Sequence, residues 1–252
     1  MMSHLLEVCA DSVQSAIAAQ EGGADRIELC SALVIGGLSP SPAMFQQVRE
    51  NTDIQIRVLL RPRFGDFCYD EYEFQTLKEE VRQFRELGAD GVVIGILKPD
   101  GTLNVEQMEE LVRAADGIGI TMHRAFDLCR DPYEALEQCV SLGIDTILTS
   151  GQKSSAWEGR ELLSELVRRS DRRIDILAGA GIGPGVIGEL AEYTGVRSFH
   201  MSGKKVLDSR MEFRREGVPM GIPGFSEFEI WQTDAEQVRK AAEVLCREKT
   251  FL

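Results

Sequence analysis

The sequence predicts a single-domain (β/α)8 TIM barrel over residues 1–252, and three observations support this fold class. Short apolar runs alternate with stretches of helical spacing along the whole chain. A glycine tripeptide that ends a helix and opens a strand recurs at every second run, as GAD (23–25), GAD (88–90), GID (143–145) and GVR (195–197). The length suits eight βα units in one domain, whereas a doubly wound sheet rarely repeats so many units so evenly.

Eight apolar runs are predicted to form the strands. In chain order they are LLEVC (5–9), RIELC (26–30), IQIRVLL (54–60), GVVIG (91–95), GITMH (119–123), TILTS (146–150), IDILAG (174–179) and RSFHMS (197–202). Helices are predicted after them, where apolar residues recur about every 3.6 positions, and several begin at a proline, as at Pro42, Pro132 and Pro184. The long connection after the eighth run, about 203–232, is predicted to cover the barrel mouth.

Alternation along each strand predicts which side chains face the barrel axis. Every second residue of a strand shares a face, and in most runs one set is wholly apolar and suits packing against helices. The other, mixed set holds several titratable residues: Glu7, Glu28, Arg57, Arg61, His123 and His200. Any one of these could serve as an internal ion pair, but six of them near the carboxyl ends of the strands favour a functional site.

Composition excludes several classes of partner. The net charge of −13 opposes binding to nucleic acid or to anionic membranes. No stretch approaches the roughly 20 apolar residues of a membrane span, and the N-terminal sequence lacks the features of a signal peptide. We therefore expect a cytoplasmic protein whose six cysteines are free thiols. A homo-oligomer, either a dimer or a tetramer, is expected because symmetric assemblies are common.

The first candidate site is a soft-metal site. Cys9 and Cys30 end adjacent predicted strands with the same inward parity. Two neighbouring thiolates suit Cu(I) better than harder ions. The alternative is that both cysteines only fill the core, which is the usual role of a free cysteine.

The second candidate is an anion site in the seventh and eighth units. The stretches AGAGIGPG (178–185) and HMSGKK (200–205) lie where barrels often hold phosphate. The backbone N–H groups of Gly179, Gly181 and Gly203 are the predicted donors. The alternative is a pair of tight turns that use glycine for steric reasons.

The third candidate is acid–base or metal-assisted catalysis. Its residues are two carboxylates, two imidazoles and a further acid: Glu7, Glu28, His123, His200 and Asp127. Such groups can move protons or hold a borderline divalent ion. None of the eight runs carries an inward lysine, which argues against a Schiff-base aldolase.

The chain also resembles a known family. The stretches GGADRIELC, RPRFGDFCYD, TMHRAFD, ILTSGQKSSAWEG, AGAGI and MEFR, in this order, are similar to those of the CutC copper-homeostasis family, from LLEVCADS to at least Arg214. The resemblance implies a (β/α)8 barrel, a cytoplasmic location and copper homeostasis through Cu(I) binding, with copper as the cofactor. It makes Cys9 and Cys30 the candidate copper ligands. The family's polar motifs at the barrel mouth match Arg61, Arg63, Asp66, His123, Arg124 and Asp127.

The main hypothesis is thus a Cu(I)-binding protein of copper homeostasis. The alternative is an enzyme that acts on a small anionic or phosphorylated substrate. In that case Arg61, Arg63 and Arg124 would clamp the charge by bidentate hydrogen bonds. His123 would be the acid or base, and Asp127 or Glu28 would fix its tautomer.

Overall fold

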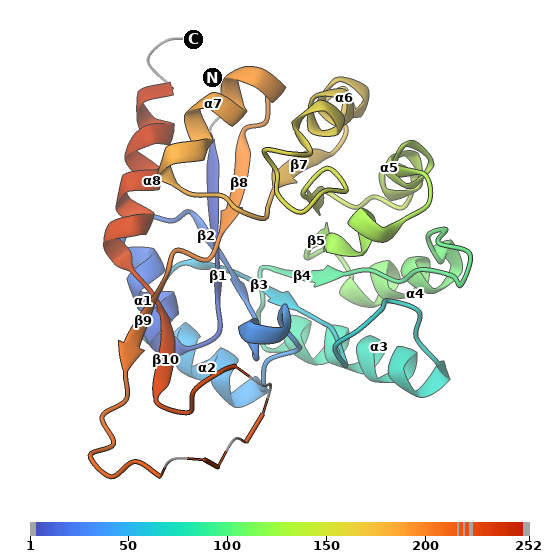
Figure 1. Ribbon diagram of the computed structural model, residues 1–252. Coiled ribbons are helices and arrows are strands. Elements are labelled where there is room, and N and C mark those ends of the chain that lie inside the picture. Colours follow the sequence, from blue (N-terminus) through green and yellow to red (C-terminus); the bar gives the residue numbers. More distant parts are fainter. Residues whose placement is uncertain (1–3, 216, 219, 222–223, 249–252) are drawn as a thin grey trace.

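A closed barrel of eight parallel strands forms the centre of the molecule (Figure 1). The structure, a computed structural model, describes residues 4–215, 217–218, 220–221 and 224–248. Each strand pairs with its neighbour in sequence, and β8 closes the barrel by pairing with β1. The predicted single-domain (β/α)8 barrel is therefore confirmed for the described residues.

The barrel strands lie within the predicted apolar runs or extend them by one residue. They are β1 (Leu5–Ala10), β2 (Arg26–Leu29), β3 (Gln55–Leu59), β4 (Gly91–Ile94), β5 (Gly119–Met122), β6 (Thr146–Thr149), β7 (Asp175–Ala178) and β8 (Ser198–Met201). Their carboxyl ends form one mouth of the barrel, so the polar residues that end the predicted runs meet there.

Eight α-helices in the described part of the chain surround the barrel (Figure 1). They are α1 (Val13–Glu21), α2 (Pro42–Asn51), α3 (Glu71–Glu86), α4 (Val105–Ala115), α5 (Pro132–Ser141), α6 (Arg160–Ser170), α7 (Pro184–Thr194) and α8 (Ala235–Glu248). Two 3-10 turns, η1 (Leu33–Ile35) and η2 (Arg124–Leu128), lie beside the mouth. Proline occupies the start of α2, α5 and α7 as predicted, because its fixed φ suits a first helical turn.

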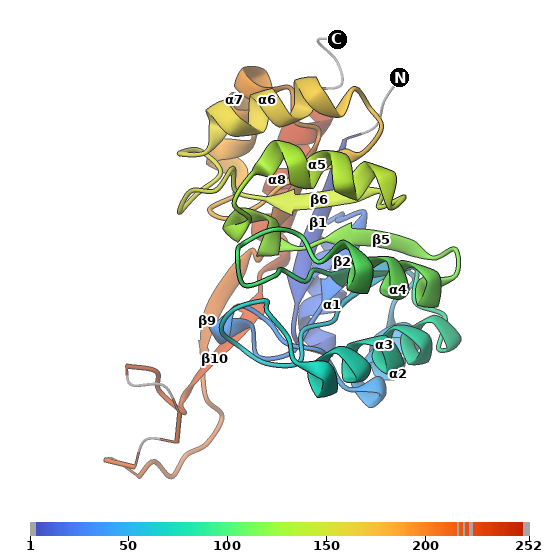
Figure 2. The ribbon, with the colours of Figure 1, turned by 90° about the vertical axis from the view of Figure 1, so that its right-hand side faces the viewer.

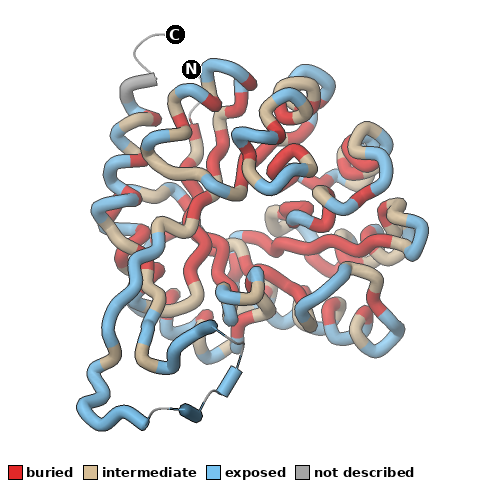
Figure 3. Tube along the Cα trace, in the orientation of Figure 1, coloured by how far each residue is buried: buried red, intermediate tan, exposed pale blue. Residues whose placement is uncertain are grey.

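The main core lies between the strands and the helices. Val8, Ile27 and Ile56 come from the apolar strand faces, are fully buried and belong to this core. The inner strand faces contribute a separate small cluster of Cys30, Leu59 and Val93. Figure 3 shows the same division as buried strands inside a ring of helices with exposed outer faces. The predicted alternation of the strand faces therefore holds.

The long connection after β8 forms a two-stranded antiparallel ribbon, β9 (Lys204–Asp208) and β10 (Glu229–Thr233). Figure 2 shows this β9–β10 ribbon and its connection extending away from the barrel body. Residues 216, 219 and 222–223 of the predicted cover lie outside the described residues, as do the ends 1–3 and 249–252 of the predicted domain. A covering role for the ribbon stays a prediction. No helix among the described residues is long and apolar enough to cross a membrane.

Candidate site at the mouth of the barrel

A small cavity of about 90 Å³ opens at the carboxyl ends of the strands. Apolar side chains, among them Leu33, Leu59 and Phe67, form part of its lining. The polar side chains of the lining are Cys9, Glu28, Cys30, Arg61, His123, Arg124 and His200. A cavity of this volume has room for an ion or for a small organic molecule.

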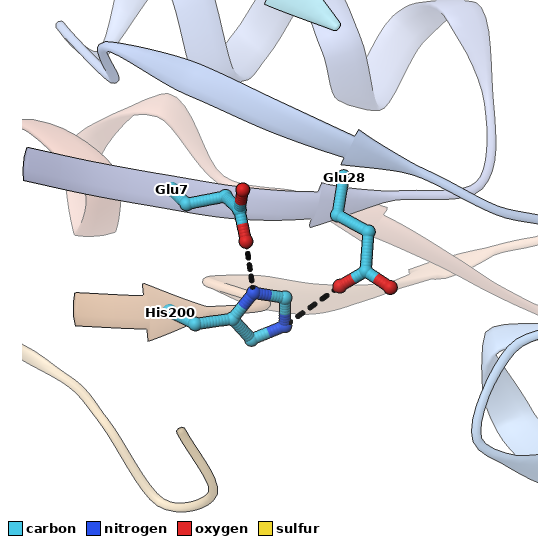
Figure 4. A group of neighbouring side chains, drawn as sticks. All are labelled: Glu7, Glu28 and His200. Atoms are coloured by element: carbon cyan, nitrogen blue, oxygen red, sulfur yellow. Dashed lines mark hydrogen bonds and ion pairs between the residues drawn. The ribbon is translucent and has the colours of Figure 1, made fainter. Parts of the chain in front are cut away.

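One side of the cavity is built on a buried ion-pair cluster. Strand register places Glu7 of β1 opposite Arg26 of β2 and opposite His200 of β8. Glu7 Oε2 accepts from Arg26 Nε at 2.5 Å, and Glu7 Oε1 lies 2.8 Å from His200 Nδ1. The other ring nitrogen, Nε2, lies 3.4 Å from Glu28 Oε2, so the imidazole bridges two carboxylates (Figure 4).

The charges in this cluster stabilise one another. Burial alone would raise the pKa of Glu7, but Arg26 and His200 outweigh it and lower that pKa to about 2. Burial likewise works against the charged form of His200, yet Cys9, Glu7 and Glu28 raise its pKa well above the ordinary value. Burial raises the pKa of Glu28 to about 7. At neutral pH the cluster therefore holds an imidazolium between one firmly ionised carboxylate and one that is close to its titration point.

Cys9 and Cys30 lie on the same side of the cavity. Cys9 is in register with Glu28, and Cys30 lies two residues further along the same face of the neighbouring strand. The Cys9 Sγ lies 3.6 Å from the Met201 carbonyl oxygen, to which the thiol donates. Burial, helped by Cys9 and by the nearby acids, raises the pKa of Cys30 well above its ordinary value. Both residues are buried thiols that line the cavity, and Cys30 also belongs to the small inner core cluster.

His123 lies on the other side, at the end of β5. Its Nδ1 accepts a hydrogen bond from the Ala125 backbone N–H at 3.1 Å, and its ring lies 4.7 Å from that of Phe67. Burial and the positive charge of Arg61 lower its pKa to about 3, so the imidazole is neutral. Its Nε2 is buried and has no hydrogen-bond partner among the described residues. The backbone of η2 therefore fixes the tautomer, in place of the carboxylate of Asp127 or Glu28 that the sequence suggests for that role.

Arg61 follows β3 and is also buried. Its two terminal nitrogens donate to the carbonyls of residues 35–37 and of Gly65, and its guanidinium stacks over the Phe67 ring at 4.9 Å. No carboxylate in the described part of the chain forms an ion pair with it. Arg61 thus brings an uncompensated positive charge to the cavity.

The remaining predicted arginines have internal partners. Arg63 pairs with Asp66 and Glu73 and does not line the cavity. Arg124 lines the cavity rim, but its Nε donates to Asp127 at 2.7 Å. The structure therefore brings Arg61 and Arg124 to the cavity and leaves Arg63 in the loop after β3.

Asp127 organises the loop after β6. It accepts hydrogen bonds from the Thr149 and Ser150 hydroxyls and from the backbone N–H groups of Ser150 and Gln152. These hydrogen bonds and the ion pair with Arg124 occupy both oxygens of the carboxylate. The geometry gives Asp127 the role of holding the TMHRAFD turn against the next loop.

The three predicted anion-binding glycines do not line the cavity. The Gly179 N–H donates to the Thr149 carbonyl, so the barrel ladder already uses it. Gly181 and Gly203 adopt positive φ values of 74° and 52°, which glycine tolerates without a steric penalty. These observations fit the alternative interpretation, in which the glycines serve tight turns.

Two residues of the site were not chosen from the sequence. Arg26 shares the inward face of RIELC with Glu28 and Cys30, so its parity was an available signal for the ion pair with Glu7. Phe67 lies in a loop and stacks on His123 and Arg61, and no periodic pattern marks it.

Among the described residues, Glu7, Glu28 and His200 form a group whose ligand atoms lie within 4.8 Å of one another. Such a group can in principle hold a divalent metal ion. However, both carboxylate oxygens of Glu7 already have cationic partners, and Arg26 would repel an incoming cation. The thiol pair is the softer and less encumbered donor set.

Comparison with known proteins places these features in a family context. The sequence profile of the CutC family matches residues 4–205. A CutC family protein of Parabacteroides distasonis is 45% identical over 240 residues, which span 94% of this chain and 99% of that protein. One from Bacteroides fragilis is 44% identical over 245 residues, which span 96% and 98%.

Solved structures agree with the barrel fold. The crystal structure of CutC from Streptococcus agalactiae, provisionally named a copper homeostasis protein, aligns with a TM-score of 0.76 at 29% identity. The alignment covers 79% of this chain and 98% of that one. Phosphoribosylanthranilate isomerase of Thermotoga maritima aligns at 0.59 with 13% identity, which indicates a shared fold alone.

Proposed function

The chain belongs to the CutC family, and on that premise we propose that it serves copper homeostasis in the cytoplasm by binding Cu(I) through Cys9 and Cys30. The observation that carries the proposal is that both thiols line one cavity of about 90 Å³. Cu(I) prefers soft sulfur ligands, and both residues supply one. The shared cavity supports the pair that the family resemblance makes the candidate ligands.

The surroundings of the thiols support a monovalent soft ion. Two thiolates and one Cu(I) carry a net charge of −1, and His200 lies beside Cys9 on the neighbouring strand β8. A positively charged imidazole there would offset that charge inside a poorly hydrated site. Harder divalent ions would need the carboxylates of Glu7 and Glu28, and Glu7 is already paired with Arg26.

Loading the site requires loss of thiol protons. Burial raises the pKa of Cys30, so its thiol is protonated at neutral pH. Metal binding then releases protons, and we expect the apparent affinity for Cu(I) to rise with pH. A titration of the reduced protein at pH 6, 7 and 8 measures this dependence.

The deciding experiment is an anaerobic Cu(I) titration against a chelating competitor, with the reduced protein and the Cys9→Ser/Cys30→Ser variant. We expect one tightly bound ion per chain in the parent and loss of that binding in the variant. A matched control is Cys129→Ser/Cys139→Ser, because these two cysteines are also buried but lie outside the cavity. Equal Cu(I) affinity of the parent and the Cys9/Cys30 variant would contradict the proposal.

An enzymatic role remains the second candidate, since one observation favours it. Arg61 and His123 line the cavity, and each has a buried N–H group without a partner among the described residues, a feature that copper binding does not require. Activity on a phosphorylated substrate has less support, because Arg63 is engaged elsewhere and Arg124 is paired with Asp127.

We further propose that the chain assembles with copies of itself, as a dimer or a tetramer. The β9–β10 ribbon and its connection carry a series of exposed large apolar side chains, and such patches commonly mark interfaces. They are Val206, Leu207, Met211, Phe213, Val218, Met220, Phe225 and Ile230. Sedimentation of the parent and of Phe213→Glu/Ile230→Glu tests this: we expect a smaller species in the variant, and a monomeric parent would refute the assembly.

A further inference from the structure

Two residues that line the cavity carry buried hydrogen-bond donors for which the described residues offer no acceptor. Cys9 and Cys30 belong to β1 and the end of β2, whereas His123 follows β5, four strands from β1 in the closed order of eight. Arg61 follows β3 and approaches His123 through their shared contact with the Phe67 ring. We call Arg61 and His123 the donor wall.

Arg61 supplies charge and one free donor. Only 8% of the residue is exposed, and its two terminal nitrogens are held by backbone carbonyls. Its Nε is buried without a hydrogen-bond partner in the part of the chain that the structure describes. A buried guanidinium without a carboxylate is costly, and an anion beside it would reduce that cost.

His123 supplies a second donor of known tautomer. Its Nδ1 accepts from the Ala125 N–H, so the single proton of the neutral ring resides on Nε2. That Nε2–H is buried and unpaired among the described residues, and the ring lines the cavity. A fixed, neutral N–H donor of this kind serves to bind an oxygen acceptor.

We propose that the donor wall binds the carboxylate group of a small monocarboxylate, with one oxygen at Arg61 Nε and the other at His123 Nε2. Two N–H donors match the two oxygens of a planar carboxylate, and one uncompensated guanidinium matches a single negative charge. A phosphate dianion would bring an excess charge and two further oxygens that these two donors do not match. Arg124, at the rim, is already neutralised by Asp127.

This site is independent of the copper proposal, because it shares no residue with the thiol pair. It would give the cavity an organic ligand whose carboxylate lies against the donor wall and whose remainder points toward Cys9, Cys30 and Glu28. Such an arrangement also supplies the substrate class that the enzyme candidate lacks.

The test is a titration with sodium acetate, followed by NMR of the histidine rings. The chain has only three histidines, so each ring is assigned from a single variant. We expect acetate to bind with a Kd on the order of a millimolar, as befits a ligand of four heavy atoms, and to shift the His123 Nε2–H resonance. Sodium chloride and inorganic phosphate at equal ionic strength are the controls.

Two substitutions of His123 distinguish loss of the Nε2 donor from loss of the folded structure. His123→Asn keeps an acceptor for the Ala125 N–H but removes the Nε2 donor, and we expect it to weaken acetate binding by roughly tenfold or more. His123→Gln keeps a donor near Nε2, and we expect a loss of less than about threefold. Cys9→Ser/Cys30→Ser should bind acetate like the parent, which separates this site from the copper site.

Three results would overturn the proposal. These are an unchanged His123 resonance at saturating acetate, equal acetate affinity in His123→Asn and the parent, or tighter binding of phosphate than of acetate. The first is measured on the unaltered protein, so it stands even if a variant fails to fold.

Discussion

His123 and His200 are both buried imidazoles that line the same cavity, yet their protonation is opposite. His200 sits between Glu7 and Glu28, at 2.8 and 3.4 Å, and its pKa is raised well above the ordinary value. His123 faces the Arg61 guanidinium and the Phe67 ring, and its pKa falls to about 3. One side of the cavity therefore holds a cation and the other a neutral N–H donor.

The comparison shows that burial alone does not decide the charge of a side chain. Burial disfavours the cationic form of both rings, so it lowers both pKa values. For His123, burial is the larger cause of the lowered pKa and the charge of Arg61 adds to it, whereas the anionic neighbours of His200 outweigh burial and reverse the sign of the shift. Changing those neighbours, or the rings themselves, tests the comparison directly.

The largest effect is expected from Glu7→Gln. The substitution removes the carboxylate that pairs with both Arg26 and His200, and it leaves a buried guanidinium without a partner. Breaking such a buried pair costs about 3–5 kcal/mol of the free energy of unfolding. Urea denaturation at pH 7 measures this, and NMR should show the pKa of His200 falling toward its ordinary value.

A matched control is Glu137→Gln, which removes the carboxylate from an exposed pair with Arg173. Because exposed ion pairs contribute little, we expect a much smaller loss than at Glu7. Similar losses at Glu7 and Glu137 would mean that the cluster around His200 does not stabilise its charges as described.

A smaller effect is expected from His123→Asn on the pH dependence of stability. The folded pKa of His123, about 3, lies below the ordinary 6.5, so the unfolded chain binds the proton first as pH falls. Stability from this group is complete above pH 6.5 and is lost as pH falls from 6.5 toward 3. Between pH 7 and pH 5 the parent should lose about 2 kcal/mol that the variant does not lose.

The measurement is the free energy of unfolding of both proteins at several pH values. Parallel curves would show that His123 can be protonated inside the fold. His200 acts with the opposite sign: its contribution is present below pH 6.5 and is lost as pH rises through its raised folded pKa. The difference between parent and His123→Asn isolates the His123 contribution from that of His200.

Strand parity explains how much of the site could be predicted from the sequence. Alternation fixes which face of a strand a residue occupies. The inward position of Glu7, Glu28, Cys9 and Cys30 could therefore be predicted from the sequence alone. The eight apolar runs gave the barrel strands for the same reason, since their spacing reflects burial on one face or on both.

Parity does not determine which inward residues meet. The contact of Glu7 with His200 depends on the register at barrel closure, between strands nearly two hundred residues apart. The partners of Arg63 and Asp127 depend on how two loops fold, and loops carry no periodic signal. The opposite charges of His123 and His200 follow from these contacts, so they were beyond reach of the sequence pattern.

The smallest expected effect on stability concerns two glycines, Gly95 and Gly179, which directly follow β4 and β7. Each lies next to one of the two histidines. A Cβ on Gly95 would lie 2.6 Å from both Cε1 and Nδ1 of His123, a ring held by the Ala125 N–H. A Cβ on Gly179 would meet only the Leu148 Cδ1 at that distance, the far end of a flexible side chain.

We therefore expect Gly95→Ala to cost about 1–3 kcal/mol, because the fixed ring or the strand must move, and Gly179→Ala to cost less than about 1 kcal/mol. Urea denaturation of both variants, with NMR of the histidine rings, compares them. Gly95→Ala should also shift the His123 resonances, whereas Gly179→Ala should leave those of His200 near their parent positions. Equal losses would mean that His123 is no more firmly held than Leu148, and the donor wall would then lack the rigidity that a fixed N–H donor requires.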